Sequence, residues 1–176
     1  ELDAVAYGWS AGFRDELHLD LYLDRLAESA VDDPSTAATI VKRLKDERNN
    51  DRAPRVEFDA FLAAHGLQDR AALIDHHECH ALGAYLLSPF DDAYVLTCDG
   101  RGDYQSLTLS KMAADEIVTL HRETSTDSLG YFFGRVTRLL GFKHNRHEGK
   151  LTGLAAYGNA VATAPLMRKM IDYRSG

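Results

Sequence analysis

Three histidines and two carboxylates lie within seven residues of this chain, in the stretch DHHECHA that runs from Asp75 to Ala81. A helix that begins near Asp75 or His76 places His76 and His80 on one face, with Cβ atoms about 5–6 Å apart. Two imidazoles at that spacing can bind one divalent cation, whereas His77 points about 100° away. The pair then needs a further ligand from elsewhere in the protein, from substrate or from water. The alternative is a polar helix start, with His80 hydrogen-bonded in the core.

A second polar group follows the next apolar run, in the stretch VLTCDGRGDYQS. Asp99 ends a strand pattern there and is followed by Gly100, Gly102 and Asp103. Glycines allow the backbone to approach a phosphate closely, and an aspartate at a strand end can meet a metal ion, a hydroxyl or a bound water. A β-hairpin with a glycine-rich turn explains the same letters equally well.

A third group lies in NRHEGKLTGLAAYG, where Glu148, Gly149 and Lys150 open a predicted helix. Free backbone N–H groups at a helix start, together with a lysine, can bind an anion. A charged first helical turn without a ligand is the alternative.

The first part of the chain must supply elements that position these residues. Hydrophobic periodicity predicts a buried strand over Leu2–Trp9, then an amphipathic helix within residues 10–33. A second helix begins with Pro34 in its first turn and stops at the asparagines near residue 50. A third covers residues 55–66 and ends at Gly66.

The pattern then changes to short apolar runs bounded by polar turns. A strand over residues 71–75 leads into the histidine cluster, whose helix continues through residue 88. Three consecutive strands are predicted over residues 92–100, 104–112 and 116–123. Two more helices follow, one after Asp127 or Ser128 as N-cap and one that begins near Glu148. The sequence therefore predicts a mixed sheet with flanking helices.

Composition limits the class of protein. The chain has 176 residues, of which 45% are hydrophobic and 27% charged, so we expect part of one soluble globular domain over residues 1–176. The net charge of -7 argues against broad binding to nucleic acid. Cys79 and Cys98 have no paired spacing and no secretory leader precedes them, which favours the cytoplasm. Apolar runs are too short to span a membrane.

Taken together, DHHECHALGAYLLSPFDDAYVLTCDGRGD, ETSTDSLGYFFGRVTRLLGF and NRHEGKLTGLAAYG resemble the O-carbamoyltransferase family, which includes nodulation-factor and antibiotic carbamoyltransferases. The likeness is dense from Ala71 to Gly158 and extends, more distantly, to the tRNA threonylcarbamoyl-transfer proteins. It implies an α/β fold of the actin-like ATPase or ribonuclease-H-like type, present here as an incomplete, interior piece. Opening strands, a downstream aspartate ligand and a C-terminal adenylate-forming domain are expected outside this chain.

The resemblance also implies an enzyme, an ATP-dependent O-carbamoyltransferase. The C-terminal domain of such proteins makes carbamoyl-adenylate from carbamoyl phosphate and ATP, and the N-terminal domain passes the carbamoyl group to a hydroxyl of a small-molecule acceptor. His76 and His80 match two ligands of an iron-type divalent metal, Fe²⁺. Further residues match segments that hold the nucleotide and the carbamoyl-adenylate: Asp99, Gly100, Gly102, Asp103, Glu148, Gly149 and Lys150.

Two other functions compete with this one. The chain can be a nucleotide- and metal-binding module without catalysis of its own, because an actin-like domain can serve as a regulatory device. A metallohydrolase is disfavoured, because Glu78 lies two residues after His76 and not one, so no His-Glu-x-x-His motif occurs. The acceptor, the catalytic base and the oligomeric state are left open by the sequence, and we expect the 176 residues alone to have weak activity or none.

Overall fold

The computed structural model describes residues 2–10, 15–114 and 116–171. The chain divides into two compact units, residues 1–131 and residues 132–176, and each is described by itself.

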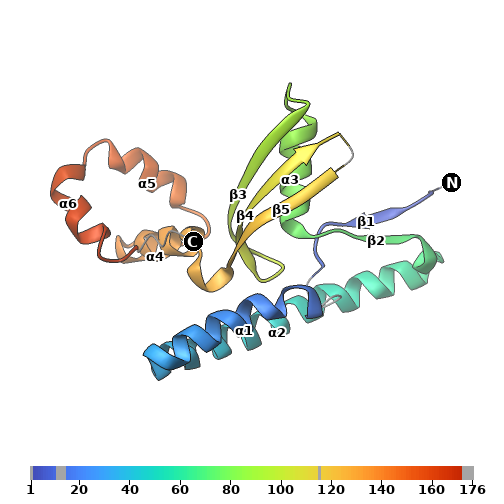
Figure 1. Cartoon of the computed structure of the whole chain (residues 1–176), viewed down its shortest axis with the longest axis horizontal. Helices are drawn as coiled ribbons and strands as arrows, with labels where there is room; N and C mark the ends of the chain where they lie inside the picture. Colours follow the sequence, from blue (N-terminus) through green and yellow to red (C-terminus); the bar gives the residue numbers. More distant parts are fainter. Residues whose placement is uncertain (1, 11–14, 115, 172–176) are drawn as a thin grey trace. The chain divides into compact units, whose positions relative to one another are not determined.

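The first unit contains two sheets (Figure 1). Strands β1 (Val5–Tyr7) and β2 (Ala71–Leu73) pair in parallel. Strands β3 (Asp92–Gly102), β4 (Gln105–Ala113) and β5 (Glu116–Thr124) form an antiparallel sheet in that order. The α/β class with mixed pairing and flanking helices is confirmed, whereas the actin-like assignment stays a prediction.

Strand β1 is shorter and more exposed than expected. The prediction of a buried strand over Leu2–Trp9 is wrong, because only Val5–Tyr7 is strand and its residues are half-buried or exposed. The pairing partner β2 has only three residues, so the ladder cannot extend further. The three predicted strands over residues 92–123 are confirmed as β3, β4 and β5.

Two long helices run side by side, α1 (Asp15–Asp32) and α2 (Pro34–His65) (Figure 1). The Asp33 carboxylate caps α2 by accepting the N–H groups of Ser35 and Thr36. At the other end Gly66 adopts the left-handed conformation, with φ 65°, as a helix C-cap commonly does. The predicted start at Pro34 and end at Gly66 are therefore confirmed.

The predicted break between residues 50 and 55 is wrong, because α2 is continuous through Pro54. A proline inside a helix removes one backbone hydrogen bond and normally favours a kink or an end. Here Glu47 and Asp51 of the preceding turns are buried and paired with arginine side chains. The contacts of both carboxylates with Arg101 of β3 are tertiary, and they hold the helix where local sequence indicates a stop.

The hydrophobic core of the first unit lies between the long helices and the turn that joins β3 to β4. Tyr22, Ile40 and Tyr104 are its buried members, with Trp9, Leu26 and Leu44 packed around them. Tyr104 comes from the turn itself, and its ring meets that of Tyr22 edge to face at 5.8 Å between centroids. The tip of the hairpin is therefore inserted into the helical layer and is not a solvent-exposed loop.

Helix α3 (His76–Leu86) packs on β3, and the 3₁₀ turns η1 (Gln68–Arg70) and η2 (Ser125–Asp127) connect neighbouring elements. Helix α4 (Leu129–Leu139) follows η2, and the Ser128 hydroxyl accepts the Tyr131 N–H at 3.0 Å, which confirms Ser128 as its cap.

The second unit contains the rest of α4 with α5 (Glu148–Ala155) and α6 (Ala160–Met167). The helix predicted to begin near Glu148 is confirmed.

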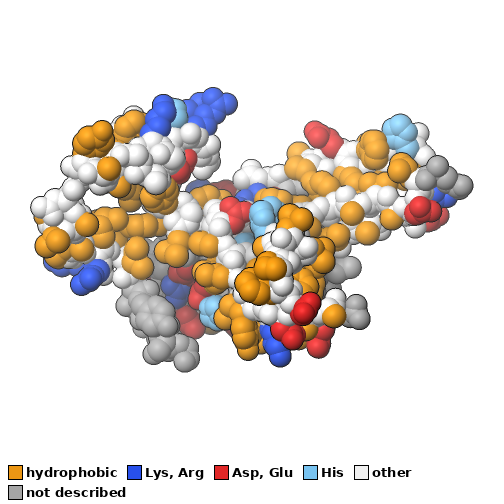
Figure 2. Space-filling model, turned by 90° about the horizontal axis from the view of Figure 1, so that it is seen from above, with side chains coloured by type: hydrophobic (Ala, Val, Ile, Leu, Met, Phe, Trp, Pro, Cys, Tyr) orange, Lys and Arg blue, Asp and Glu red, His pale blue; other side chains and the backbone are white. Residues whose placement is uncertain are grey.

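Some large hydrophobic side chains lie on the protein surface (Figure 2), and on strand β3 of the first unit they include Tyr94 and Leu96. Within the described residues, no helix is both long enough and apolar enough to cross a membrane.

Candidate metal site at the start of helix α3

The start of α3 is fixed by an aspartate cap. Asp75 accepts the backbone N–H groups of His77 at 2.8 Å and of Glu78 at 3.1 Å, and its other oxygen accepts from the Gln105 amide at 2.9 Å. The cap makes His76 the first helical residue, as the sequence predicts. His76 and His80 consequently project from one face, one turn apart.

Three potential metal-binding atoms converge beside this face. The Nε2 atoms of His76 and His80 lie 3.0 Å apart, and Asp99 Oδ2 lies 3.1 Å from the first and 3.5 Å from the second. Two donors that are each about 2.1 Å from one ion and at right angles to each other are about 3 Å apart. The arrangement fits two imidazoles and one carboxylate on the same side of a single divalent cation, with open positions on the other side.

Hydrogen bonding around His76 supports the same conclusion. Its Nδ1 atom lies 3.3 Å from the carbonyl oxygen of Gly8. A neutral imidazole that donates from Nδ1 carries a lone pair on Nε2, and here Nε2 faces the carboxylate of Asp99 and the imidazole of His80. A cation at this point would satisfy all three acceptors, and a carbonyl partner on the outer nitrogen is the usual arrangement for a metal-binding histidine.

Asp99 reaches the histidines because β3 is irregular at this point. The register pairs Cys98 with Leu107 and then Gly102 with Gln105, so β3 has two more residues than β4 between these pairs. Bulges of this kind redirect a side chain. The backbone of Asp99 is held as well, since its carbonyl accepts the Ser128 hydroxyl at 3.0 Å.

The surroundings favour an ionised Asp99 carboxylate. Burial alone would raise the pKa of Asp99, but the contact with the His76 imidazole, the hydrogen bond from the Gly100 N–H and the neighbouring His80 bring it below its usual range. A cavity of about 310 Å³ opens beside the carboxylate. Its lining residues are His80, Ala84, Val95, Leu96, Thr97, Cys98 and Asp99.

The glycine-rich stretch after Asp99 forms a β-hairpin, the simpler of the two structures considered from sequence. A Cβ atom on Gly102 would lie 2.0 Å from Cδ2 of His76, so the absent side chain makes room for the imidazole. At Gly100 the same atom would meet only Tyr131, at 3.7 Å. Asp103 is fully buried and accepts backbone N–H groups of Ser10 and His76.

The third histidine of the cluster, His77, is buried and does not join the other two. His77 is 1% exposed, and its Nδ1 atom contacts the Thr97 hydroxyl at 2.7 Å. Burial lowers the pKa of His77, which favours the neutral form. Cys79 is half-buried, and burial raises the pKa of its thiol. Neither residue belongs to the group of three donors, in agreement with the helical geometry.

A tryptophan that the sequence reasoning missed completes the surroundings of His76. The ring centroids of Trp9 and His76 lie 4.5 Å apart in an edge-on arrangement, and the guanidinium of Arg101 lies 5.4 Å from the Trp9 ring. Its position as the last residue of the predicted first strand was the available signal, because residues at strand ends often border sites.

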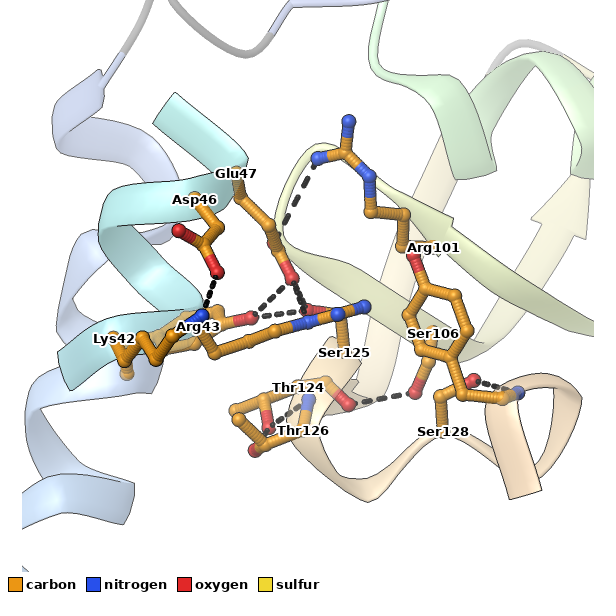
Figure 3. A network of polar contacts seen from close by, with 12 residues as sticks. Lys42, Arg43, Asp46, Glu47, Arg101, Ser106, Thr124, Ser125, Thr126 and Ser128 are labelled. Carbon is orange, nitrogen blue, oxygen red and sulfur yellow. Dashed lines mark hydrogen bonds and ion pairs between the residues drawn. The ribbon is translucent and has the colours of Figure 1, made fainter. Parts of the chain in front are cut away.

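A buried polar network ties the bulge of β3 to helix α2 (Figure 3). Arg101 donates to both oxygens of Asp51, at 2.6 and 3.2 Å, and approaches Glu47 at 3.8 Å. Burial alone would lower the pKa of Arg101, but these carboxylates raise it overall. Glu47 also accepts from Arg43 at 2.8 Å and from Ser125. These contacts hold Arg101, two positions after Asp99, to helix α2.

Glu148, Gly149 and Lys150 belong to the second unit, where they form the first turn of α5. Glu148 accepts the Asn145 N–H at 2.6 Å, so it closes the turn that precedes the helix. A Cβ atom on Gly149 would have no neighbour within 4 Å.

Fold and site together define an α/β protein with a candidate divalent-cation site at a helix start. Comparison with known proteins assigns it more narrowly: a match to the family described as Carbamoyltransferase N-terminus covers residues 23–173, and the chain belongs to that family. The resemblance inferred from the three sequence motifs is thereby confirmed.

Three relatives illustrate how the chain compares with longer proteins. Nodulation protein NolNO of Sinorhizobium fredii is 34% identical over 127 residues, which are 66% of this chain and 18% of that protein. Nodulation protein NolO of Bradyrhizobium diazoefficiens is 35% identical over 86 residues, 49% of this chain and 16% of that protein. An uncharacterized protein of Synechocystis is 33% identical over 101 residues, 57% of this chain and 16% of that protein. The chain thus spans less than a fifth of each relative.

Proposed function

We propose that this chain is the metal-bearing part of an enzyme that transfers a carbamoyl group to a hydroxyl of a small-molecule acceptor. Family membership supports the reaction class. The convergence of His76 Nε2, His80 Nε2 and Asp99 Oδ2 within 4.8 Å is the observation that carries the proposed site. Two imidazoles and a carboxylate with open positions suit Fe²⁺, which we propose as the resident ion.

The proposed donor is carbamoyl-adenylate, made from carbamoyl phosphate and ATP by an adenylate-forming domain of the same parent protein. In the transfer, the acceptor hydroxyl loses its proton and its oxygen bonds to the carbamoyl carbon, while the bond from that carbon to the phosphate oxygen breaks and AMP leaves. A bound divalent cation supplies polarisation of the carbamoyl oxygen. The cavity beside His80 and Asp99 offers room for part of a substrate next to these donors.

The described residues have separate tasks in this scheme. His76 and His80 hold the cation, and the ionised Asp99 either joins them or accepts a hydrogen bond from bound adenylate. We assign no catalytic base among the described residues. Gly100, Gly102, Glu148, Gly149 and Lys150 are proposed to border the nucleotide on the strength of the family motif alone.

The test uses the intact protein with His76→Ala and His80→Ala, and with His121→Ala as the matched control. His121 is an exposed histidine on β5 that pairs with Glu123 at 2.8 Å, outside the proposed site. Iron content and carbamoyl transfer from carbamoyl phosphate, ATP and a hydroxyl acceptor should fall together in the first two variants and stay unchanged in the control. Unchanged iron content in both site variants would contradict the metal assignment.

The second candidate is a nucleotide- and metal-binding module without catalysis, which the site geometry fits equally because it requires only ligands. The same assays distinguish the two. Binding of iron and ATP by the intact protein with no carbamoylated product, across a panel of sugars and aminoglycosides, would favour the module.

A further inference from the structure

Asp103 occupies an unusual position at the tip of the β3–β4 hairpin. It and Tyr104 form the two-residue turn between the paired residues Gly102 and Gln105, and both have positive φ, 49° and 66°. Non-glycine residues seldom adopt this conformation, although aspartate does so more readily than most. A buried tip with two such residues persists only where surrounding contacts hold it.

The carboxylate of Asp103 joins three segments of the chain. Its Oδ2 atom accepts the backbone N–H of Ser10 and that of His76, each at 2.8 Å, and the residue has no exposed surface. Ser10 follows β1, His76 opens α3, and Asp103 itself follows the last residue of β3. One oxygen atom therefore fixes the relative places of the parallel strand pair, the helix and the hairpin.

The first turn of α3 divides its free N–H groups between two carboxylates. Asp75 accepts those of His77 and Glu78, and Asp103 accepts that of His76, the first helical residue. A negative charge at a helix N-terminus is favourable, and here it is supplied from 27 residues away in sequence. The position of the His76 backbone is set by the hairpin and not only by its own cap.

The imidazole of His76 is confined as well as its backbone. The Gly102 position leaves room for the ring, Trp9 packs against its edge, and the Gly8 carbonyl lies 3.3 Å from Nδ1. Both Gly102 and Asp103 belong to the end of the same hairpin. A shift of this hairpin would move the Nε2 atom that faces His80 and Asp99.

We propose that Asp103 is a positioning residue for the His76 donor, which it holds by its backbone without touching a substrate or ion. The inference rests on the proposed function, because it takes His76 and His80 as cation ligands. It assigns to Asp103 a role different from the nucleotide contact that the family resemblance implies. Partners of metal ligands typically change metal affinity about 10–100-fold when they are replaced.

The experiment titrates Co²⁺ into the metal-free intact protein and records the visible absorption of the bound ion. Asp103→Asn and Asp103→Gly both tolerate positive φ, so each removes the carboxylate without imposing a new backbone conformation. We expect the dissociation constant for Co²⁺ to rise about 10–100-fold and the spectrum at saturation to change. Met112→Ala is the stability control, since Met112 is fully buried in β4 and its substitution should destabilise the sheet.

The possible outcomes separate this inference from the proposed function. Weaker binding with an altered spectrum in both Asp103 variants, but not in Met112→Ala, supports the positioning role. Wild-type affinity and spectrum in the Asp103 variants overturn it, and so does an equal loss of affinity in Met112→Ala. His76→Ala is included as a reference. If that variant binds Co²⁺ as the wild type does, the proposed metal site itself fails.

Discussion

The starts of helices α3 and α5 both contain residues that could do chemistry, yet they are held in different ways. At α3, Asp75 and Asp103 cap the first N–H groups, and Gln105 and Asp99 add contacts from the next hairpin. At α5, the contacts of the first turn are local: Asn145 donates to Glu148, and Lys143 donates to His147, four residues away.

The difference bears on where a precise site can form. Side chains that bind an ion must be held in place before the ligand arrives, and long-range contacts achieve this better than a single local turn. The start of α3 meets this requirement, because His76 is held by Asp103 and Asp99 of the β3–β4 hairpin and contacts the Gly8 carbonyl in the segment after β1. The start of α5 has the composition of an anion site, but within the described part of the chain the side-chain hydrogen bonds at its first turn come from positions no more than four residues away.

The largest effect on folding is expected for Arg101, which links the bulge beside Asp99 to α2. Arg101→Ala leaves the buried Asp51 carboxylate without its bidentate partner, and loss of one member of a buried ion pair typically costs about 3–5 kcal/mol. The free energy of unfolding, measured by urea denaturation, should fall by that amount. Additional replacement of Asp51 by asparagine should recover part of the loss.

The control for this prediction is the neighbouring pair of Lys42 and Asp46 on α2, which is exposed (Figure 3). Its atoms approach to 2.6 Å, but exposed pairs of this kind contribute about 0.2–1 kcal/mol at most. Lys42→Ala should therefore change stability little. Equal effects of Lys42→Ala and Arg101→Ala would show that burial does not distinguish the two pairs.

An intermediate effect is expected from adding one methyl group at each helix start. Gly102→Ala places Cβ 2.0 Å from Cδ2 of His76, so the ring must move, at a cost of about 1–3 kcal/mol. Gly149→Ala in α5 meets no neighbouring atom and should stabilise the helix by up to about 1 kcal/mol. The two glycine variants thus predict opposite changes in melting temperature.

The two glycine variants should also differ in their binding of metal ions. We expect Gly102→Ala to weaken Co²⁺ binding because it displaces a proposed ligand, and Gly149→Ala to leave it unchanged. Destabilisation by both substitutions would contradict the distinction drawn between the two helix starts.

Local signals in the sequence predicted much of the fold. The three strands of the antiparallel sheet, the start of α3 near Asp75, and the caps at Gly66 and Ser128 follow from alternation and capping chemistry. The continuity of α2 could not be predicted in this way. It depends on ion pairs between Asp51 and an arginine 50 residues further along the chain.

The candidate site was predicted in part. Helical spacing selected His76 and His80, and a strand-end aspartate was a possible metal partner, but only the tertiary structure shows Asp99 within 3.5 Å of both imidazoles. The bulge that redirects Asp99 has no simple sequence signature. The contact between Gly102 and His76 was also unpredictable, because glycine in such a turn has a sufficient local explanation.

The smallest effect is expected at Glu148. Burial alone would raise its pKa, but hydrogen bonds from its own backbone N–H and those of Asn145 and Arg146 bring the pKa below the usual range. Because the folded-state pKa is lowered, the contribution of Glu148 to the stability of this turn is complete above the unfolded-state pKa of about 4.3 and is lost as the pH falls below it. Glu148→Gln should therefore increase amide exchange at Asn145 at neutral pH and remove its acid dependence, while α3 amides stay protected. Faster exchange at His76 in this variant would mean that the two helix starts are coupled, and the contrast between local and long-range support would not hold.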